Sequence, residues 1–191
     1  MPEQLSFFEQ DTPLVLPEGF KYERELITPE TEQTLLAAVR DLPFKEFEFH
    51  GYVGKRRTVS FGAAYDFAEG KLRPAEEMPP FLVALRETAA TFAGVSIDAL
   101  RQVLVTEYGA RAGIGWHRDK AVFGEVIGIS LLSSCRFRLR RKVGENWERV
   151  TIDAAPRSAY LLSGPARSEW EHSIPEVEKP RYSITYRTIR A

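Results

Sequence analysis

The chain has 191 residues, of which 43% are apolar, 28% are charged and 12% are aromatic. These values are typical of a folded globular protein and exclude an intrinsically disordered chain. The net charge of −1 gives no overall attraction to nucleic acid or membrane, so any such binding must come from local patches. The single cysteine, Cys135, excludes an internal disulfide framework and is predicted to be a small buried residue.

No secretory signal or membrane-spanning segment is predicted. The first residues, MPEQLSFFEQ, lack a basic start followed by a long apolar run. No apolar stretch approaches the roughly 20 residues that cross a bilayer. We therefore expect one cytoplasmic domain over residues 1–191, with no membrane contact and no obligate protein partner.

Two helices are predicted in the first half of the chain. The first lies within residues 27–44, where Thr28 can accept a hydrogen bond at the N-terminus and Pro29 suits the first turn. The second is predicted over residues 79–94, with Gly94 as its C-terminal cap. Both segments carry apolar residues at helical spacing, so we expect them to pack on a core.

The rest of the chain is predicted to be irregular or β. Residues 1–20 contain three prolines and are expected to form an irregular lead-in, and residues 51–67 are interpreted as short strands and a loop. From residue 102 to residue 190, short β-branched or alternating segments are separated by turn signals. The pattern predicts an α+β, mostly β fold, with a sandwich or jelly roll over residues 102–190 and the N-terminal helices on one side.

The stretch GWHRDK (115–120) contains a possible metal-binding pair. In an extended segment, His117 and Asp119 point to the same face and can offer a nitrogen and an oxygen to one point. A polar turn is the alternative, because such a pair arises easily by chance. Of the other two histidines, His50 has no motif around it and is interpreted as structural or exposed.

His172, in SEWEHSIPEV, is the candidate third ligand. Two imidazoles and one carboxylate on one face of a metal leave three coordination positions open, as in non-haem Fe(II) oxygenases. Zinc hydrolases also use this ligand set, but they commonly carry both histidines in an H-E-x-x-H helix, which this chain lacks. Iron is therefore favoured over zinc.

The segment RYSITYR (181–187) can present a cationic and hydroxylic face. Two guanidiniums and two hydroxyls inside a jelly roll would need an anionic partner, and a dicarboxylate such as 2-oxoglutarate would satisfy them. In the alternative orientation, Tyr182, Ile184 and Tyr186 point inward and both arginines are exposed. Periodicity leaves the two open. The residues of the polar face are Arg181, Ser183, Thr185 and Arg187.

Together, GIGWHRDK, SGPARSEWEHSIP and RYSITYR resemble the AlkB family of Fe(II)- and 2-oxoglutarate-dependent dioxygenases. That family carries H-x-D, a distant H and R-x-N/S-x-x-x-R, in this order, on a double-stranded β-helix. Segments around both predicted helices and KRRTVSFGAAYDF also resemble the family. The resemblance implies a double-stranded β-helix (jelly roll) core with the helices packed on one side.

The resemblance also implies roles for single residues. His117, Asp119 and His172 would hold Fe(II), with O2 and 2-oxoglutarate as co-substrates. Arg181 would pair with the far carboxylate of 2-oxoglutarate, and Arg187 would lie near its metal-proximal end. Three further residues would complete the 2-oxoglutarate site, two of them where many members carry Asn: Tyr108, Thr106 and Ser183.

The activity implied by the resemblance is oxidative demethylation of N-alkylated bases in DNA or RNA, which releases formaldehyde, succinate and CO2. Ala121 stands where several base-repairing members carry an acidic residue, which leaves base selectivity open. The alternatives are the same chemistry on a protein or small molecule, and a catalytically silent binding module.

Residues 51–67 correspond to the substrate lid of the family. Lys55, Arg56 and Arg57 are candidate phosphate contacts, and Phe61, Tyr65 and Phe67 are candidate stacking residues. A second basic run, Arg136, Arg138 and Arg140, could follow a nucleic-acid backbone, or it could be an ordinary solvated strand face. Trp116 and Trp170 flank metal ligands and are expected to wall the site.

Overall fold

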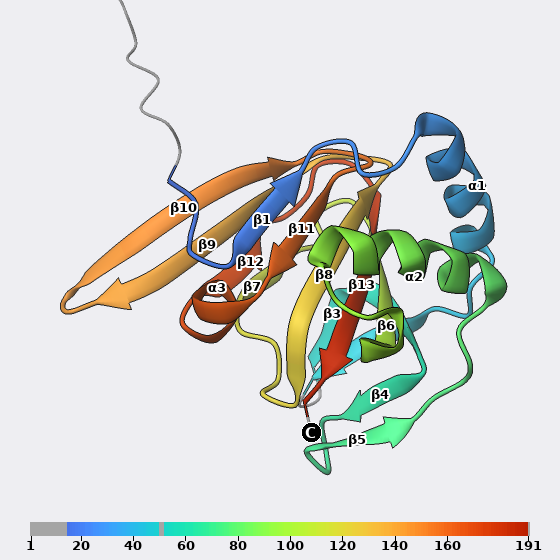
Figure 1. The fold of residues 1–191 in the computed structure, drawn as a ribbon, viewed down its shortest axis with the longest axis horizontal. Coiled ribbons are helices and arrows are strands. Elements are labelled where there is room, and N and C mark those ends of the chain that lie inside the picture. Colours follow the sequence, from blue (N-terminus) through green and yellow to red (C-terminus); the bar gives the residue numbers. More distant parts are fainter. Residues whose placement is uncertain (1–14, 50–51, 191) are drawn as a thin grey trace, which may run out of the picture.

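Two antiparallel sheets form the body of the protein (Figure 1). A computed structural model of the chain describes residues 15–49 and 52–190, so most of the predicted lead-in and His50 lie outside the described residues. The major sheet has the order β1 (Phe20–Glu23), β11 (Ala159–Leu162), β8 (Phe123–Leu131), β13 (Arg181–Ile189), β6 (Leu100–Tyr108), β3 (Tyr52–Phe61) and β2 (Lys45–Phe49). The minor sheet has the order β10 (Asn146–Ala154), β9 (Cys135–Val143), β12 (Glu171–Ile174) and β7 (Ile114–His117). The predicted mostly β, jelly-roll class is confirmed.

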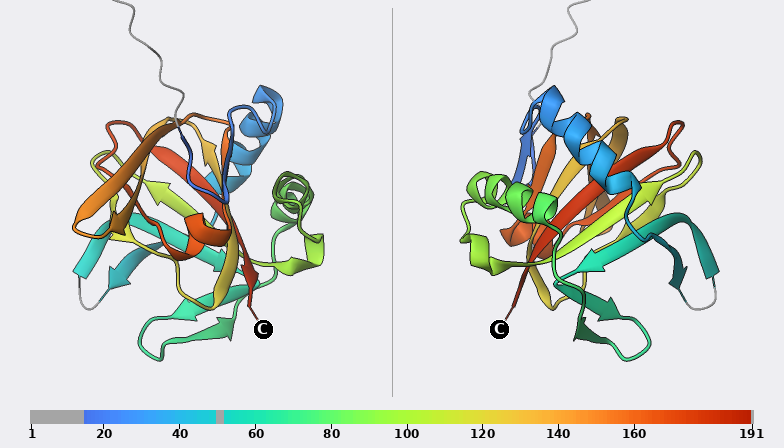
Figure 2. Two further views of the ribbon diagram at one scale, coloured as in Figure 1. Left: turned by 60° about the vertical axis from the view of Figure 1, so that its left-hand side comes forward. Right: turned by 90° about the vertical axis from the view of Figure 1, so that its right-hand side faces the viewer.

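Two helices cover the outer face of the major sheet, and both lie on the same side of the jelly roll (Figure 2). The first, α1 (Pro29–Arg40), begins where predicted: the Thr28 hydroxyl accepts a hydrogen bond from the Thr31 amide at 3.2 Å. The second, α2 (Pro80–Ala93), ends at Gly94, whose φ of 69° favours glycine. Their buried side chains join those of the sheet in one apolar cluster.

This cluster determines which face of β13 points inward. Ile184 and Tyr186 are buried among the helices, and the Tyr186 hydroxyl donates a 2.6 Å hydrogen bond to the Leu82 carbonyl on α2. Because side chains alternate along a strand, the odd-numbered residues of β13 must face the space between the two sheets. Of the two orientations that periodicity left open, the structure therefore has the one with the polar face inward.

The inner face of the major sheet is unusually polar. Across the strands, Ser183 is aligned with Thr106 on one side and Ser130 on the other, and Arg181 is aligned with Tyr108. These side chains are all buried, although they lie between two sheets that would normally enclose apolar groups.

A second apolar cluster closes the jelly roll beneath this polar face. The Phe137 and Tyr160 rings stack with their centroids 4.3 Å apart, and Cys135 is buried beside them, as predicted. Tyr160 lies flat on β8 at Gly128, where an added Cβ would come within 2.3 Å of the tyrosine ring. Only glycine fits there, so Gly128 fixes the depth of the tyrosine in the core.

Three smaller elements flank the sheets. A hairpin of β4 (Ala63–Asp66) and β5 (Lys71–Pro74) projects beside the jelly roll (Figure 1). The short helix α3 (Gly164–Ser168) precedes β12, and a 3₁₀ turn, η1 (Ile97–Ala99), follows α2.

None of the helices in the described ranges is long and apolar enough to cross a membrane.

Candidate metal centre and co-substrate site

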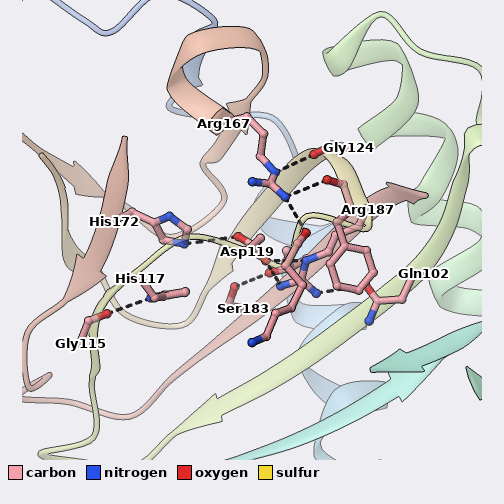
Figure 3. Close-up of polar contacts among 12 residues, drawn as sticks. Gln102, Gly115, His117, Asp119, Gly124, Arg167, His172, Ser183 and Arg187 are labelled. Carbon is pink, nitrogen blue, oxygen red and sulfur yellow. Dashed lines mark hydrogen bonds and ion pairs between the residues drawn. The ribbon is translucent and has the colours of Figure 1, made fainter. Parts of the chain in front are cut away.

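His117, Asp119 and His172 meet between the two sheets (Figure 3). His117 ends β7 and is the direct cross-strand partner of His172 on β12, while Asp119 lies in the loop that follows β7. Their candidate ligand atoms all lie within 4.8 Å of one another. Strand pairing thus brings together two residues that are far apart in the sequence.

Both imidazoles are held in defined orientations. The Nδ1 of His117 lies 2.8 Å from the Gly115 carbonyl oxygen. A carbonyl only accepts, so Nδ1 carries the proton and Nε2 keeps its lone pair. The Nε2 of His172 lies 3.5 Å from Oδ2 of Asp119, and the two imidazole centroids are 4.2 Å apart.

Arg187 keeps the carboxylate of Asp119 charged. Its Nε and Nη2 lie 2.8 and 2.7 Å from Oδ1 of Asp119, and its Nη1 donates to Gln102 at 3.0 Å. Burial alone would raise the pKa of Asp119, but the Arg187 guanidinium beside it holds that pKa well below its usual range. Oδ1 is thereby occupied, whereas Oδ2 makes no hydrogen bond within the described residues.

Burial keeps both imidazoles neutral. Burial, with a smaller contribution from the neighbouring His117, lowers the pKa of His172 to about 3. The pKa of His117 is also lowered, chiefly by burial. Two neutral imidazoles and a carboxylate oxygen without a hydrogen-bond donor are the donor set that Fe(II) takes in facial-triad sites, so these residues fit the metal.

Arg181 lies deeper in the jelly roll and is only 1% exposed. One guanidinium nitrogen donates to the Ser130 hydroxyl at 2.9 Å, and the group lies over the Tyr108 ring at 4.9 Å. Its Nε and Nη1 have no hydrogen-bond partner in the part of the chain that the structure describes. A buried cation with two such donors is unfavourable unless an anion completes it, and a carboxylate is the usual partner of a guanidinium.

Hydroxyl groups surround this guanidinium. Ser183 and Thr106 are neighbours across β13 and β6, and the Ser183 and Thr185 hydroxyls lie 3.3 Å apart. The five residues predicted for 2-oxoglutarate therefore share one inner face. Arg187 differs from its expected role in one respect, because its guanidinium is engaged by Asp119 and Gln102 rather than directed at a free anion.

A pair of arginines ties the loop after β7 to α3. Arg167 is 6% exposed and donates to three backbone carbonyls, those of Lys120, Phe123 and Gly124, at 2.7–2.8 Å (Figure 3). In the opposite direction, Arg118 donates to the Ser168 carbonyl at 2.9 Å. The loop that carries Asp119 is thereby fixed to the helix that precedes His172.

Sequence reasoning missed several of these residues. Arg167 lies in the SGPARSEWEHSIP motif, but that motif does not indicate that the arginine side chain is buried. Gln102 and Ser130 are ordinary polar residues on strands, with no motif around them. Alternation along β6 would have placed Gln102 on the inner face once Thr106 was assigned to that face. Ser130 lies on β8, and its place follows from its pairing with Ser183 on β13.

The structure separates the predicted phosphate contacts. Arg56 is the cross-strand partner of Tyr108 and donates to the Gly113 carbonyl at 3.3 Å, and burial lowers its pKa. Arg57 points the other way and forms a two-bond pair with Glu107 at 2.8 and 2.9 Å. Lys55 is exposed and lies 3.9 Å from a carboxylate oxygen of Glu176. Only Arg56 shares a strand face with the site.

The prediction that Phe61 stacks on a substrate is wrong, because its side chain is 3% exposed and packs in the core cluster of the helices. Tyr65 and Phe67 belong to the β4–β5 hairpin, and their rings meet edge to face with centroids 5.1 Å apart. Lys120 places its ammonium 5.4 and 5.3 Å from these two rings, and Tyr65 also approaches Phe123 at 6.5 Å. This aromatic pair therefore lies beside the loop that carries Asp119.

Neither tryptophan lines the metal site as predicted. Trp116 lies between Arg138 and Arg140, on the outer face of the minor sheet. Trp170 is 5% exposed and packs in the apolar cluster beneath the site, with Arg141 over its outer side. Trp116 directly precedes His117 in β7, so alternation turns its side chain away from that histidine.

Comparison with known proteins identifies the fold and the family. Residues 25–187 match the 2OG-Fe(II) oxygenase superfamily. The chain is 29% identical over 196 residues to the "Alkylated DNA repair protein ALKBH8 homolog" of Arabidopsis thaliana, covering 87% of this chain but about half (54%) of that relative.

Two solved structures share the fold at low identity. OsALKBH1 superposes with a TM-score of 0.64 at 14% identity, over 91% of this chain and 100% of that one. A Pseudomonas putida prolyl-4-hydroxylase superposes with a TM-score of 0.60 at 11% identity, over 91% and 94%. The match over residues 25–187 shows that the chain belongs to the 2OG-Fe(II) oxygenase superfamily and is a dioxygenase that uses Fe(II), 2-oxoglutarate and O2, and the similarity to two AlkB homologues agrees with the motifs.

Proposed function

We propose that this dioxygenase removes N-methyl groups from alkylated bases in DNA or RNA, with His117, Asp119 and His172 holding its Fe(II). The observation that carries the proposal is the triad of one buried and two half-buried residues, together with a buried, incompletely bonded Arg181 on the inner face of the same jelly roll. The two features provide separate places for a metal and for a dicarboxylate, which is the pair of ligands that this chemistry needs.

The chemistry that bound Fe(II) supplies with 2-oxoglutarate and O2 is oxidation of the N-methyl carbon, which leaves as formaldehyde while succinate and CO2 are formed. In this proposal the Arg181 guanidinium binds the far carboxylate of 2-oxoglutarate, and Ser130 holds the guanidinium in place. Arg187 keeps Asp119 ionised, and Gly115 fixes the tautomer of His117.

The mouth of the site supports a nucleic-acid substrate. Tyr65 and Phe67 offer aromatic surface beside the Asp119 loop, Lys120 and Arg56 offer positive charge, and Phe67 is 42% exposed. A base flipped out of a strand needs a stacking surface and cations for its flanking phosphates. The name of the Arabidopsis relative points the same way, whereas the likeness to a prolyl hydroxylase concerns the fold only.

The experiment is incubation of the protein with Fe(II), 2-oxoglutarate, ascorbate and a panel of N-methylated oligonucleotides, with formaldehyde and base masses as readouts. We expect demethylation of at least one base, its loss in His117→Ala, and full activity in Glu87→Gln, an exposed change on α2. Methylated peptides in the same panel test the alternative substrate class. Succinate formation without demethylation of any nucleic acid would contradict the proposal.

A further inference from the structure

The outer face of the minor sheet carries cations and tryptophans that the metal site does not use. On β9, Phe137 and Leu139 are buried in the core, so the residues between them point outward. The same alternation places part of β10, and Trp116 on β7, on this outer face. We call the group the outer cationic face, and its members are Trp116, Arg136, Arg138, Arg140, Lys142, Trp147 and Arg149.

Arginine and tryptophan alternate in space across this face. The Arg140 guanidinium lies between two indole rings, 4.4 Å from the centroid of Trp116 and 4.2 Å from that of Trp147. Arg138 covers the other part of Trp116 at 4.9 Å. The stack holds the rings upright on the sheet, and Trp147 remains 36% exposed at its end.

Positive charge exceeds negative charge on the outer cationic face, in a chain with a net charge of −1. The nearby carboxylates are Glu171, which pairs with Arg140 at 2.6 Å, and Asp153, the cross-strand partner of Arg136. Arg136, Lys142 and Arg149 are exposed, and no ion pair of theirs is found among the described residues. Large aromatic side chains are uncommon among the mostly charged and small polar residues of a solvated strand face, so the two tryptophans distinguish this face.

We propose that the outer cationic face binds a single-stranded nucleic acid, with phosphates on the arginines and a base stacked on Trp147. Interleaved aromatic rings and cations are the means by which single strands are held without sequence preference, because an unpaired base exposes its ring face. A duplex covers those ring faces, which favours a single strand as the occupant. The inference rests on the proposed function and adds to it a strand preference and a second contact surface.

The position of the face relative to the metal centre supports this use. The minor sheet spans about 14 Å across its four strands, from β10 to β7. β7 is the edge strand and ends in His117, one residue after Trp116. A strand that crosses the face toward β7 therefore reaches the strand that ends in His117, whose side chain points to the opposite, inner face where the candidate active site lies.

The test compares charge reversals on two surfaces. Arg136→Glu with Arg149→Glu removes two exposed cations from the outer cationic face, and Arg40→Glu with Lys45→Glu makes the same charge change on α1 and β2. Binding of a fluorescein-labelled, unmodified single-stranded oligonucleotide is followed by anisotropy over a range of salt concentrations. We expect the first pair to weaken binding at least about tenfold and to reduce the salt slope by roughly 1.4, since each lost phosphate contact accounts for about 0.7.

Trp147→Ala tests the stacking separately. We expect about fivefold weaker binding of the single strand with an unchanged salt slope, because a lost stacked base removes no phosphate contact. Unchanged circular dichroism and melting temperature show that the variants fold. Equal effects of the two charge-reversal pairs, or a duplex bound as tightly as the single strand, would overturn the inference.

Turnover separates this inference from the proposed function. For the outer-face pair we expect a raised KM for a methylated oligonucleotide, and an unchanged kcat and unchanged turnover of a methylated mononucleoside. If wild-type protein demethylates oligonucleotides and the outer-face pair does so with an unaltered KM, the surface assignment is wrong and the enzymatic one stands. If wild-type protein binds single strands through this face but demethylates none, the enzymatic assignment is wrong.

Discussion

Replacing Arg181 with methionine is expected to stabilise the protein when 2-oxoglutarate is absent. The guanidinium is 1% exposed, and two of its nitrogens lack partners among the residues that the structure describes. Each buried donor of this kind costs roughly 1–3 kcal/mol. Methionine has a similar length and needs no partner, so it fills the space without that cost.

The expected gain is smaller than the sum of the two donors. The substitution also removes the hydrogen bond to Ser130 and the contact with the Tyr108 ring, each of which contributes on the order of 1 kcal/mol. Two unpaired donors cost roughly 2–6 kcal/mol together, so the balance is about 0–4 kcal/mol and centres on about 2 kcal/mol. For a chain of this size, about 2 kcal/mol corresponds to a melting temperature higher by roughly 4–8 °C.

The assay is thermal unfolding with and without Mn(II) and 2-oxoglutarate. At a ligand concentration about 100-fold above Kd, the wild type gains roughly 2.7 kcal/mol and Arg181→Met gains nothing, so the order of the two melting temperatures reverses. Arg40→Met, an exposed change on α1, serves as the control and is expected to stay within about 0.5 kcal/mol of the wild type.

Two results would refute the reasoning. A lower melting temperature of Arg181→Met without ligand would mean that the guanidinium is satisfied in the unliganded protein. An equal rise of both proteins with 2-oxoglutarate would mean that the co-substrate binds elsewhere.

Three further predictions concern the metal ligands and the core. Arg187→Met should raise the pKa of Asp119 and weaken Mn(II) binding about 10–100-fold by calorimetry, and an unchanged affinity would contradict its role. Because burial lowers the pKa of both imidazoles, protons should compete with Mn(II) only in acid, so affinity should be nearly flat from pH 8 to about pH 6; a loss that follows an ordinary histidine pKa near 6.5 would argue against their burial. Gly128→Ala should lower the free energy of unfolding by about 1–3 kcal/mol through its clash with Tyr160, whereas Gly109→Ala, which has open space around its Cβ, should not.

The candidate metal ligands and the cationic strand stand out in the sequence because their chemistry is local and distinctive, and the structure brings the three candidate ligands together. His117 and Asp119 lie two residues apart, and His172 and RYSITYR could be recognised by type and order. The helix termini followed equally local rules, as the Thr28 cap shows.

The remaining features depend on contacts that form only when strands pair. Phe61 was expected to stack on substrate, but its strand alternates so that Phe61 meets the helices and Arg56 meets the site. The sequence did not determine which face of β13 points inward. The hydrogen bond from the Tyr186 hydroxyl to the Leu82 carbonyl on α2 shows that the even-numbered residues face the helices. Arg167 acts through carbonyl groups of a distant loop, and no pattern in its own segment encodes them.

The backbone contacts of Arg167 determine which side chains of the loop after Asp119 are free to vary. Arg167 grips the loop after Asp119 only through main-chain oxygens, at Lys120, Phe123 and Gly124. Every residue type offers the same carbonyl, so the side chains at positions 120 and 121 can change without altering the path of the loop. The side chain at position 121 can therefore change between alanine and an acid while the nearby Asp119, the candidate iron ligand, keeps its place.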